Sequence, residues 1–272
     1  MLDEMDAAIE AARAAGLMLA DRFGHARVVE HKGPIDIVTD ADQSAERCIV
    51  AILSEATPDH GFLTEEAPPI RGVGNTRWIV DPLDGTVNFV RGIPHFGVSI
   101  ALEREGQLEL GVIFDPLRQE LFAARRSMGA TLNGAVIRVS AIDSLRQAVV
   151  STGFPYDAWT NERDNTVEVA HLIKRVFSLR SSGSAALDLA AVACGRLDLD
   201  WERGLHPYDV AAGVLIVREA GGIATDYAGG DDAVYSRELV AGNARVHAAA
   251  LAELEAAWQS HDGVQDQAGQ MM

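Results

Sequence analysis

The sequence is poor in cysteine and lacks long hydrophobic runs. Its two cysteines, Cys48 and Cys194, are too few for a disulfide framework and do not have the spacing of a zinc site. No apolar run approaches the roughly 18 residues that suggest a membrane span, and acids stand near the N-terminus where a signal peptide needs positive charge. We therefore expect a cytoplasmic protein with no membrane partner.

Basic residues are scarce as well. The 272-residue chain has 40 acidic and 23 basic residues, a formal net charge of -17. This charge repels nucleic-acid backbones, so nucleic acid is not an expected partner. It equally repels a phosphorylated metabolite, unless bound cations reverse the sign of the charge locally. The sequence contains no GxSxG and no HExxH motif, which leaves a serine hydrolase or a zinc protease without support.

Hydrophobic residues make up 48% of the chain, which is enough for a large core. Their spacing predicts a helix over 3–22 and a second helix from "TDAD" to about Ala56, after a short strand in "IDIVTD" that ends at Thr39. From residue 97 to 139, strand-forming runs are separated by turns, the last of them at Asn133 and Gly134. This segment predicts an antiparallel meander.

After about Ser140 the pattern changes to strands that alternate with helices. The expected elements include helices over 161–176, 184–194 and 207–219, a strand over 197–201, and a last helix that ends near Trp258. The change predicts an N-terminal α+β domain over residues 1–142, a C-terminal α/β domain over 143–259 and a flexible polar tail over 260–272.

Acidic residues recur where strands end and helices begin. The set consists of Asp42, Glu65, Glu66, Asp81, Asp84, Glu202 and Asp209. Each has a plain structural explanation, such as a capping box at Asp42 or a favourable helix dipole at Asp209. Taken together, carboxylates of this kind also form magnesium sites, and two neighbouring ions need a shared ligand. Asp81, at the end of a strand, is the candidate for that bridge.

The motifs around these acids resemble those of the inositol monophosphatase family. "DPLDGTVNF" resembles the first signature of that family, and four other segments follow its order and spacing: "DIVTDAD", "TEEAP", "RSSGSAALDLA" and "GLHPYDVAAGVLIVREAGG". The resemblance covers roughly residues 3 to 258. It implies a layered αβαβα sandwich with an antiparallel N-terminal sheet and a mixed C-terminal sheet. It also implies a lithium-sensitive, Mg²⁺-dependent phosphatase that forms a homodimer.

Position by position, the resemblance implies a role for each matched residue. Two magnesium ions would be held by Glu65, Asp81, the Leu83 carbonyl, Asp84 and Asp209, with Asp81 shared and a looser third ion against Glu65. Thr86, hydrogen-bonded to Asp42, and Glu65 would orient and deprotonate the attacking water, while Glu66 would support the site from outside. The implied substrate-binding residues are Asp84, Gly85, Thr86, Gly183, Ser184, Ala185, Glu202 and Asp209.

The choice of substrate depends mainly on Glu202. A carboxylate accepts hydrogen bonds from neutral hydroxyls or pairs with an ammonium group, but it repels a second phosphate. Inositol monophosphate or a similar polyol phosphate is therefore favoured, and histidinol phosphate is the alternative within the family. There are two departures from the family pattern. Tyr208 in place of tryptophan bears on the shape of the pocket, and Thr64 in place of glycine bears on the backbone of the loop before the Glu-Glu pair. A further alternative is a regulatory protein that uses the same fold to bind a partner such as the transcription machinery.

Overall fold

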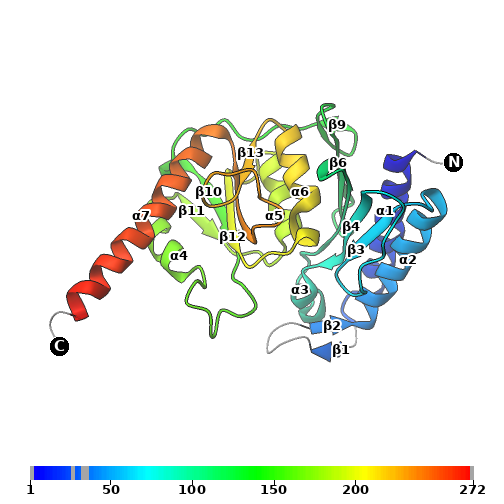
Figure 1. Ribbon diagram of the computed structural model, residues 1–272, viewed down its shortest axis with the longest axis horizontal. Helices are drawn as coiled ribbons and strands as arrows, with labels where there is room; N and C mark the ends of the chain where they lie inside the picture. The colour runs from blue at the N-terminus through cyan, green and yellow to red at the C-terminus, as the bar shows by residue number, and fades with distance from the viewer. Residues whose placement is uncertain (1–2, 26–27, 32–36, 270–272) are drawn as a thin grey trace.

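The computed structural model describes residues 3–25, 28–31 and 37–269, with the backbone alone at 28–31 and 262–269. The chain forms five layers, in which two sheets alternate with three pairs of helices (Figure 1). This arrangement confirms the expected αβαβα sandwich. The beginning of the predicted strand "IDIVTD", at Ile35 and Asp36, lies outside the described residues.

The first sheet has seven strands in the order β3-β4-β5-β6-β7-β8-β9. Their bounds are β3 Gly61–Thr64, β4 Thr76–Asp84, β5 Gly97–Arg104, β6 Gln107–Asp115, β7 Glu120–Arg125, β8 Ala130–Leu132 and β9 Ala135–Val136. Strands β4 to β9 pair antiparallel, which confirms the meander, and its last turn has positive φ at Asn133 and Gly134.

The expectation of a wholly antiparallel first sheet is wrong at its edge, where β3 runs parallel to β4. The connection over residues 65–75 allows this, because it folds back along β3 through a bridge between Phe62 and Ile70 before β4 begins. A parallel pair needs such a return, whereas a tight hairpin would have reversed the strand. As a result, the C-terminal ends of β3 and β4 lie next to each other, at the same end of the two strands.

Two helices, α1 (Glu4–Arg22) and α2 (Asp40–Ala56), cover the outer face of the first sheet. Their inward positions are mainly small, and Ala8, Ala12 and Ala45 are fully buried. The small side chains let α1 approach β6 closely, since a Cβ atom built on Gly16 would lie 2.5 Å from the ring of Phe114. Between the helices and the sheet lies the first hydrophobic core. A short pair of strands, β1 (Val28–His31) and β2 (Ile37–Thr39), precedes α2.

The second sheet is mixed, as predicted, with the order β11-β10-β12-β14-β13. Strand β10 pairs parallel with β11 and β12, whereas β14 pairs antiparallel with β12 and β13. The bounds are β10 Val149–Thr152, β11 Ser178–Arg180, β12 Leu199–Arg203, β13 Ile223–Thr225 and β14 Glu238–Gly242. A single turn of 3₁₀ helix over Leu145–Gln147 precedes β10.

Helices α5 (Ala185–Ala193) and α6 (Pro207–Glu219) lie between the two sheets, and α4 (Thr166–Leu172) and α7 (Ala244–Gly269) cover the outer face of the second. The inner pair forms one core with both sheets, and the outer pair forms another. Helices α5 and α6 therefore join the two sheets in one core. The division of the chain into two domains near residue 142 stays a prediction.

Three predicted boundaries differ from the structure. Helix α4 is shorter than 161–176, because Asn165 adopts positive φ and the Asp164 side chain accepts from the Thr166 N–H at the helix start. Strand β12 lies two residues later than predicted, after Gly195 with positive φ has ended the preceding turn. Helix α7 continues beyond Trp258 to Gly269, whereas the prediction ended this helix near Trp258 and placed a tail over 260–272.

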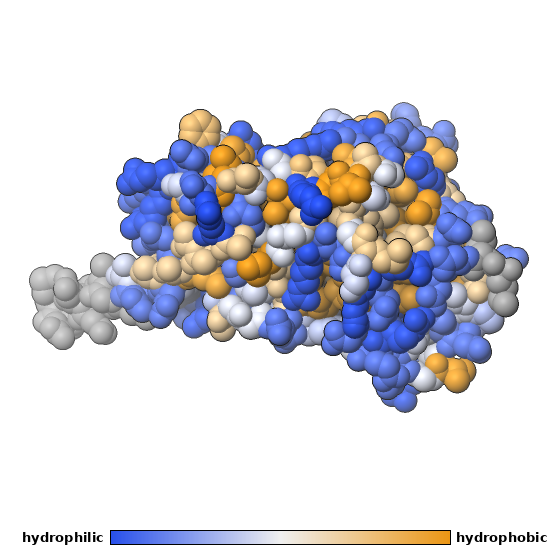
Figure 2. Space-filling model, turned by 90° about the horizontal axis from the view of Figure 1, so that it is seen from above, coloured by the Kyte–Doolittle hydropathy of each residue, from blue (hydrophilic) through white to orange (hydrophobic). Residues whose placement is uncertain are grey.

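The surface of the described chain mixes residue types. On the face shown in Figure 2, hydrophobic side chains lie in several separate groups between hydrophilic ones. Among the described residues, no helix is both long enough and apolar enough to cross a membrane.

Candidate active site

The site is built around a sharp turn at the end of β4. Regular pairing with β5 stops after Asp81 and resumes at Asp84, so the bulge contains Pro82 and Leu83. The Leu83 N–H donates to Asp81 Oδ1 at 2.9 Å, which closes the turn. Gly85 follows with φ +91°, and a Cβ atom there would lie 3.0 Å from the His95 carbonyl oxygen. Only glycine fits this position well, and α3 (Thr86–Arg91) begins directly after it.

Glu65 reaches the same place because β3 is parallel to β4. Thr64 pairs with Val80, so Glu65, the first residue after β3, lies beside Asp81. The loop after Glu65 is attached to α2, since the Glu66 N–H donates to Glu46 Oε2 at 2.8 Å. Thr64 itself ends the strand and its hydroxyl donates to the Ala67 carbonyl, so this departure from the family pattern is accommodated within the loop.

Asp42 has a capping role and also contacts the site. It forms the predicted capping box with Thr39, whose N–H donates to Asp42 Oδ2 at 2.9 Å. Its other oxygen, Oδ1, accepts from the Thr86 hydroxyl at 3.0 Å, and the same hydroxyl lies 3.0 Å from the Leu83 carbonyl oxygen. Helix α2 is thereby joined to the β4 turn.

Asp209 comes from the other half of the chain, at the start of α6. Its Oδ2 accepts from the His206 N–H at 2.6 Å, so this residue too is part of a helix cap. Helix α6 brings it to a small cavity of about 40 Å³ together with the β4 turn. The cavity is lined by Glu65, Asp81, Leu83, Asp84, Gly85, Thr86, Tyr156, His206, Tyr208 and Asp209. All the predicted metal ligands therefore line one cavity.

These carboxylates repel one another. Burial raises the pKa of Asp81 well above its ordinary value, and the charges of Glu65, Asp84 and Asp209 raise it further. Burial likewise raises the pKa of Asp209, followed by the charges of Glu65 and Asp84. Burial raises the pKa of Asp84 to about 6, although hydrogen bonds from Ser184 and the α5 backbone oppose the shift. Closely spaced, buried carboxylates are an oxygen-ligand set suited to Mg²⁺, so the residues fit the predicted ions.

A second cavity of about 280 Å³ adjoins the first and shares Asp84, Gly85, Tyr156 and Asp209 with it. Its walls include the residues predicted to line the alcohol moiety, which are Gly183, Ser184, Ala185 and Glu202. Ser184 has an additional contact, because its hydroxyl donates to Asp84 Oδ2 at 2.5 Å while its oxygen caps α5 at the Leu187 N–H.

The sequence analysis did not single out Tyr156, Asp188 or Asp200. Tyr156 lines both cavities from the loop after β10. At the smaller cavity, Tyr208 stacks on His206 with ring centroids 5.1 Å apart. Asp188 and Asp200 lie next to Glu202 and are buried. The alternation of acids in "LDLDWE" was a usable signal, since Asp200 and Glu202 are two residues apart on a strand and share a face.

Comparisons with known proteins and structures all point to one family. The inositol monophosphatase family matches residues 1–260. The chain is similar to the inositol-1-monophosphatase of Rhizobium meliloti, with 47% identity over 90% of this chain and 93% of that protein. It is also 43% identical to the Nus factor SuhB of Escherichia coli over 92% of this chain and 95% of that protein. The crystal structure of extragenic suppressor protein suhB from Bartonella henselae superposes with a TM-score of 0.86 at 43% identity, covering 92% and 97% of the two chains.

Proposed function

Because the chain belongs to the inositol monophosphatase family, and is a phosphatase on that ground, we propose that it is a Mg²⁺-dependent enzyme that hydrolyses inositol monophosphate or a similar polyol phosphate. The observation that carries the proposal is the convergence of Glu65, Asp81, Asp84 and Asp209 on one cavity. We further propose that the enzyme is a cytoplasmic homodimer, to be checked by cell fractionation and light scattering.

In this proposal Glu65, Asp81 and the Leu83 carbonyl hold one ion, and Asp81, Asp84 and Asp209 hold the second, with a third more loosely placed against Glu65. Bound magnesium would supply the positive charge that attracts the phosphate and makes a water more acidic. The chain contributes the positions of the ligands. Asp84 is fixed by Ser184 and by the Ala186 N–H, which donates to Asp84 Oδ2 at 2.8 Å, and Asp209 is fixed by the cap of α6.

Thr86 and Asp42 would orient the attacking water. The Thr86 hydroxyl donates to Asp42, so the lone pairs of Thr86 Oγ1 can accept a hydrogen bond from water. Glu65 would then take the proton that the water loses as it attacks phosphorus, with the alkoxide of the alcohol as the leaving group. The N–H groups of Gly85 and Thr86 would bind the phosphate oxygens.

Thr86→Val tests the water-orienting step. Valine has nearly the same shape but no hydroxyl, so we expect kcat to fall by about 100-fold to 10,000-fold, the range of general acid–base contributions. The affinity for Mg²⁺ should change little, because the Thr86 side chain is not a proposed ligand. Steady-state kinetics with a Mg²⁺ titration measures both quantities. Thr86→Ser keeps a hydroxyl and should retain most of the activity, and equal losses in the two variants would contradict the assignment.

Glu202 would select the alcohol moiety. Its carboxylate is buried, lines the larger cavity and packs so closely on Gly153 that a Cβ atom there would lie 2.2 Å from Glu202 Oε2. With a panel of inositol phosphate, glycerol phosphate, histidinol phosphate and adenosine bisphosphate, we expect kcat/KM to be highest for a polyol monophosphate. Glu202→Gln should lower that value on the order of 10-fold to 100-fold, as for a lost hydrogen bond to a charged group.

The same substrate panel distinguishes inositol phosphate from histidinol phosphate, the alternative substrate within the family. A histidinol-phosphate phosphatase would prefer the aminated ester, and Glu202→Gln would reduce its turnover much more than that of inositol phosphate. Preference for the bisphosphate would contradict both substrates, since a second phosphate is repelled by Glu202.

A second candidate function is regulatory binding, which the similarity to relatives named Nus factor SuhB favours. Such a role requires a partner but no turnover. Asp81→Asn protein should still capture a stoichiometric partner if this role exists, and capture combined with no turnover of any ester by the unmodified chain would favour it over catalysis.

A further inference from the structure

Three carboxylates outside the predicted set of magnesium ligands meet behind the larger cavity. Asp188 projects from α5, while Asp200 and Glu202 project from the same face of β12. Each offers an oxygen, and the three oxygens lie within 4.8 Å of one another. The residues are 2%, 0% and 8% exposed. We call Asp188, Asp200 and Glu202 the rear carboxylate cluster.

One oxygen of this cluster has no hydrogen-bond partner among the described residues. Asp200 Oδ1 accepts from the Ser151 hydroxyl at 2.7 Å, but Asp200 Oδ2 accepts no hydrogen bond from any described residue, although Asp200 is fully buried. An unpartnered buried carboxylate oxygen is costly, because it has lost its water without receiving a donor. Since Oδ1 is occupied by Ser151, Oδ2 is the oxygen that remains for a ligand.

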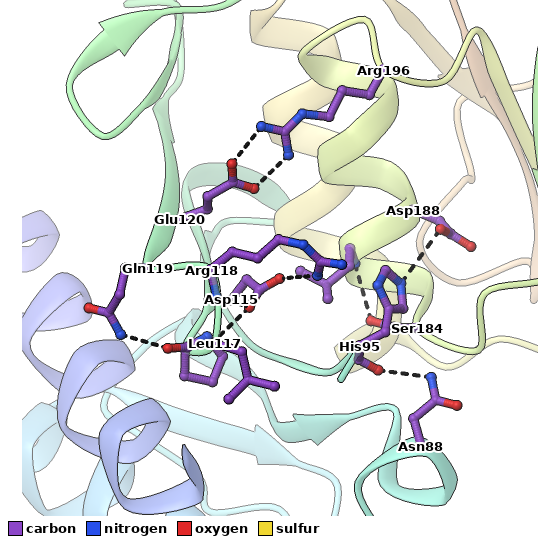
Figure 3. Close-up of polar contacts among 12 residues, drawn as sticks. Asn88, His95, Asp115, Leu117, Arg118, Gln119, Glu120, Ser184, Asp188 and Arg196 are labelled. Carbon is purple, nitrogen blue, oxygen red and sulfur yellow. Dashed lines mark hydrogen bonds and ion pairs between the residues drawn. The ribbon is translucent and has the colours of Figure 1, made fainter. Parts of the chain in front are cut away.

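Within the described residues, no arginine or lysine forms an ion pair with the cluster. In the described part of the chain, the one basic side chain with a nitrogen within 4.0 Å of these carboxylates is His95, whose Nε2 lies 3.9 Å from Asp188 Oδ1. Figure 3 shows Asp188 on α5 facing the ring of His95. Burial, followed by the charge of Arg118, lowers the pKa of His95 below its ordinary value, so the ring is neutral at neutral pH. The nearby Arg203 pairs instead with Glu168 and Glu238.

We propose that the rear carboxylate cluster binds one hard divalent cation, of the class of Mg²⁺, Mn²⁺ or Ca²⁺, separate from the ions predicted at Asp81. Carboxylate oxygens are the preferred ligands of this class, and oxygens bound to one ion at about 2.1–2.6 Å lie at most about 5 Å apart, as the three oxygens here do. Glu202 also lines the larger cavity, which provides a route of entry. The bound ion would offset the buried negative charge and hold the Glu202 carboxylate in place at the wall of the substrate cavity.

Mn²⁺ binding counted by electron paramagnetic resonance tests this site. Free Mn²⁺ is titrated into the metal-free chain, and bound ions per chain are compared for the unmodified protein, Asp200→Asn and Glu202→Gln. Each variant is expected to bind one ion fewer. Asp198→Asn is the matched control, because Asp198 is a buried aspartate two residues earlier whose Oδ2 accepts from the Val149 N–H at 2.7 Å, and it should bind the full number.

Two further measurements make the result decisive. Asp81→Asn should weaken the predicted active-site ions but keep the ion that Asp200→Asn removes. The metal-free Asp200→Asn chain should melt at or above the temperature of the unmodified chain, because one of three repelling charges is gone, which excludes misfolding as the cause. The proposal is overturned if Asp200→Asn binds as many ions as the unmodified chain, or if Asp81→Asn binds none. Because no turnover is measured, a failed phosphatase assay would leave this test unaffected.

Discussion

Replacing Asp81 by asparagine is expected to reduce kcat for inositol monophosphate by at least ~1,000-fold, equivalent to about 4 kcal/mol of transition-state stabilisation. Asparagine has the shape of aspartate, but it lacks the charge that both proposed ions share. Asp81 lines the cavity, and its pKa is raised by burial and then by the charges of Glu65, Asp84 and Asp209. The measurement is phosphate release under saturating Mg²⁺.

The chain contains a matched control for this variant. Asp115 begins the same Asp-Pro-Leu sequence at the end of β6, is 3% exposed, and accepts from the Leu117 N–H at 3.0 Å much as Asp81 accepts from Leu83. It lies outside both cavities of the proposed site. Asp115→Asn should therefore leave kcat within about 2-fold, since Asp115 touches neither cavity and a turn defect there acts on stability rather than on the reaction. Wild-type turnover by Asp81→Asn would refute the proposed ligand set.

The second large effect concerns the metal-free protein, whose stability should fall as the pH rises from 6.5 to 8. The folded pKa of Asp188 is raised to about 7, inside this range, and the pKa values of Asp81 and Asp209 lie well above the ordinary value. Unfolded carboxyls have already released their protons near pH 4. Stability that is fully present below that pH is therefore lost as the pH passes through the folded values, on the order of a few kcal/mol.

Urea unfolding in the presence of a chelator at several pH values measures this loss. The lower limit of pH 6.5 matters because burial lowers the pKa values of His95 and His247, and these residues oppose the trend at lower pH. Saturating Mg²⁺ should restore stability most strongly at pH 8, where the carboxylates are ionised and the ions bind the folded chain. A metal-free stability that rises between pH 6.5 and 8 would contradict this account.

The local parts of the site were predictable from sequence because they depend on neighbours in the chain. The capping box at Asp42 requires Thr39 three residues earlier, and the position of Asp209 at the start of α6 follows from Pro207. The alternation of strands and helices predicted the α/β character of the C-terminal half, and the family resemblance implied that its sheet is mixed. The boundaries of α4 and α7 were not, since a single positive φ at Asn165 and the continuation of a polar helix leave little trace in hydrophobic spacing.

Several contacts between residues far apart in the chain did not follow from the order of the motifs. Glu65 lies beside Asp81 because β3 is parallel to β4, in a sheet that the resemblance implied to be antiparallel. Asp188 approaches Asp200 only because α5 packs over β12, and Tyr156 reaches both cavities from a loop with no regular pattern. The sequence by itself determined which segments carry caps, turns and acids, because those properties act over a few residues. Only the tertiary structure decided which acids share one buried volume, because strand order and helix packing set distances between residues far apart in the chain.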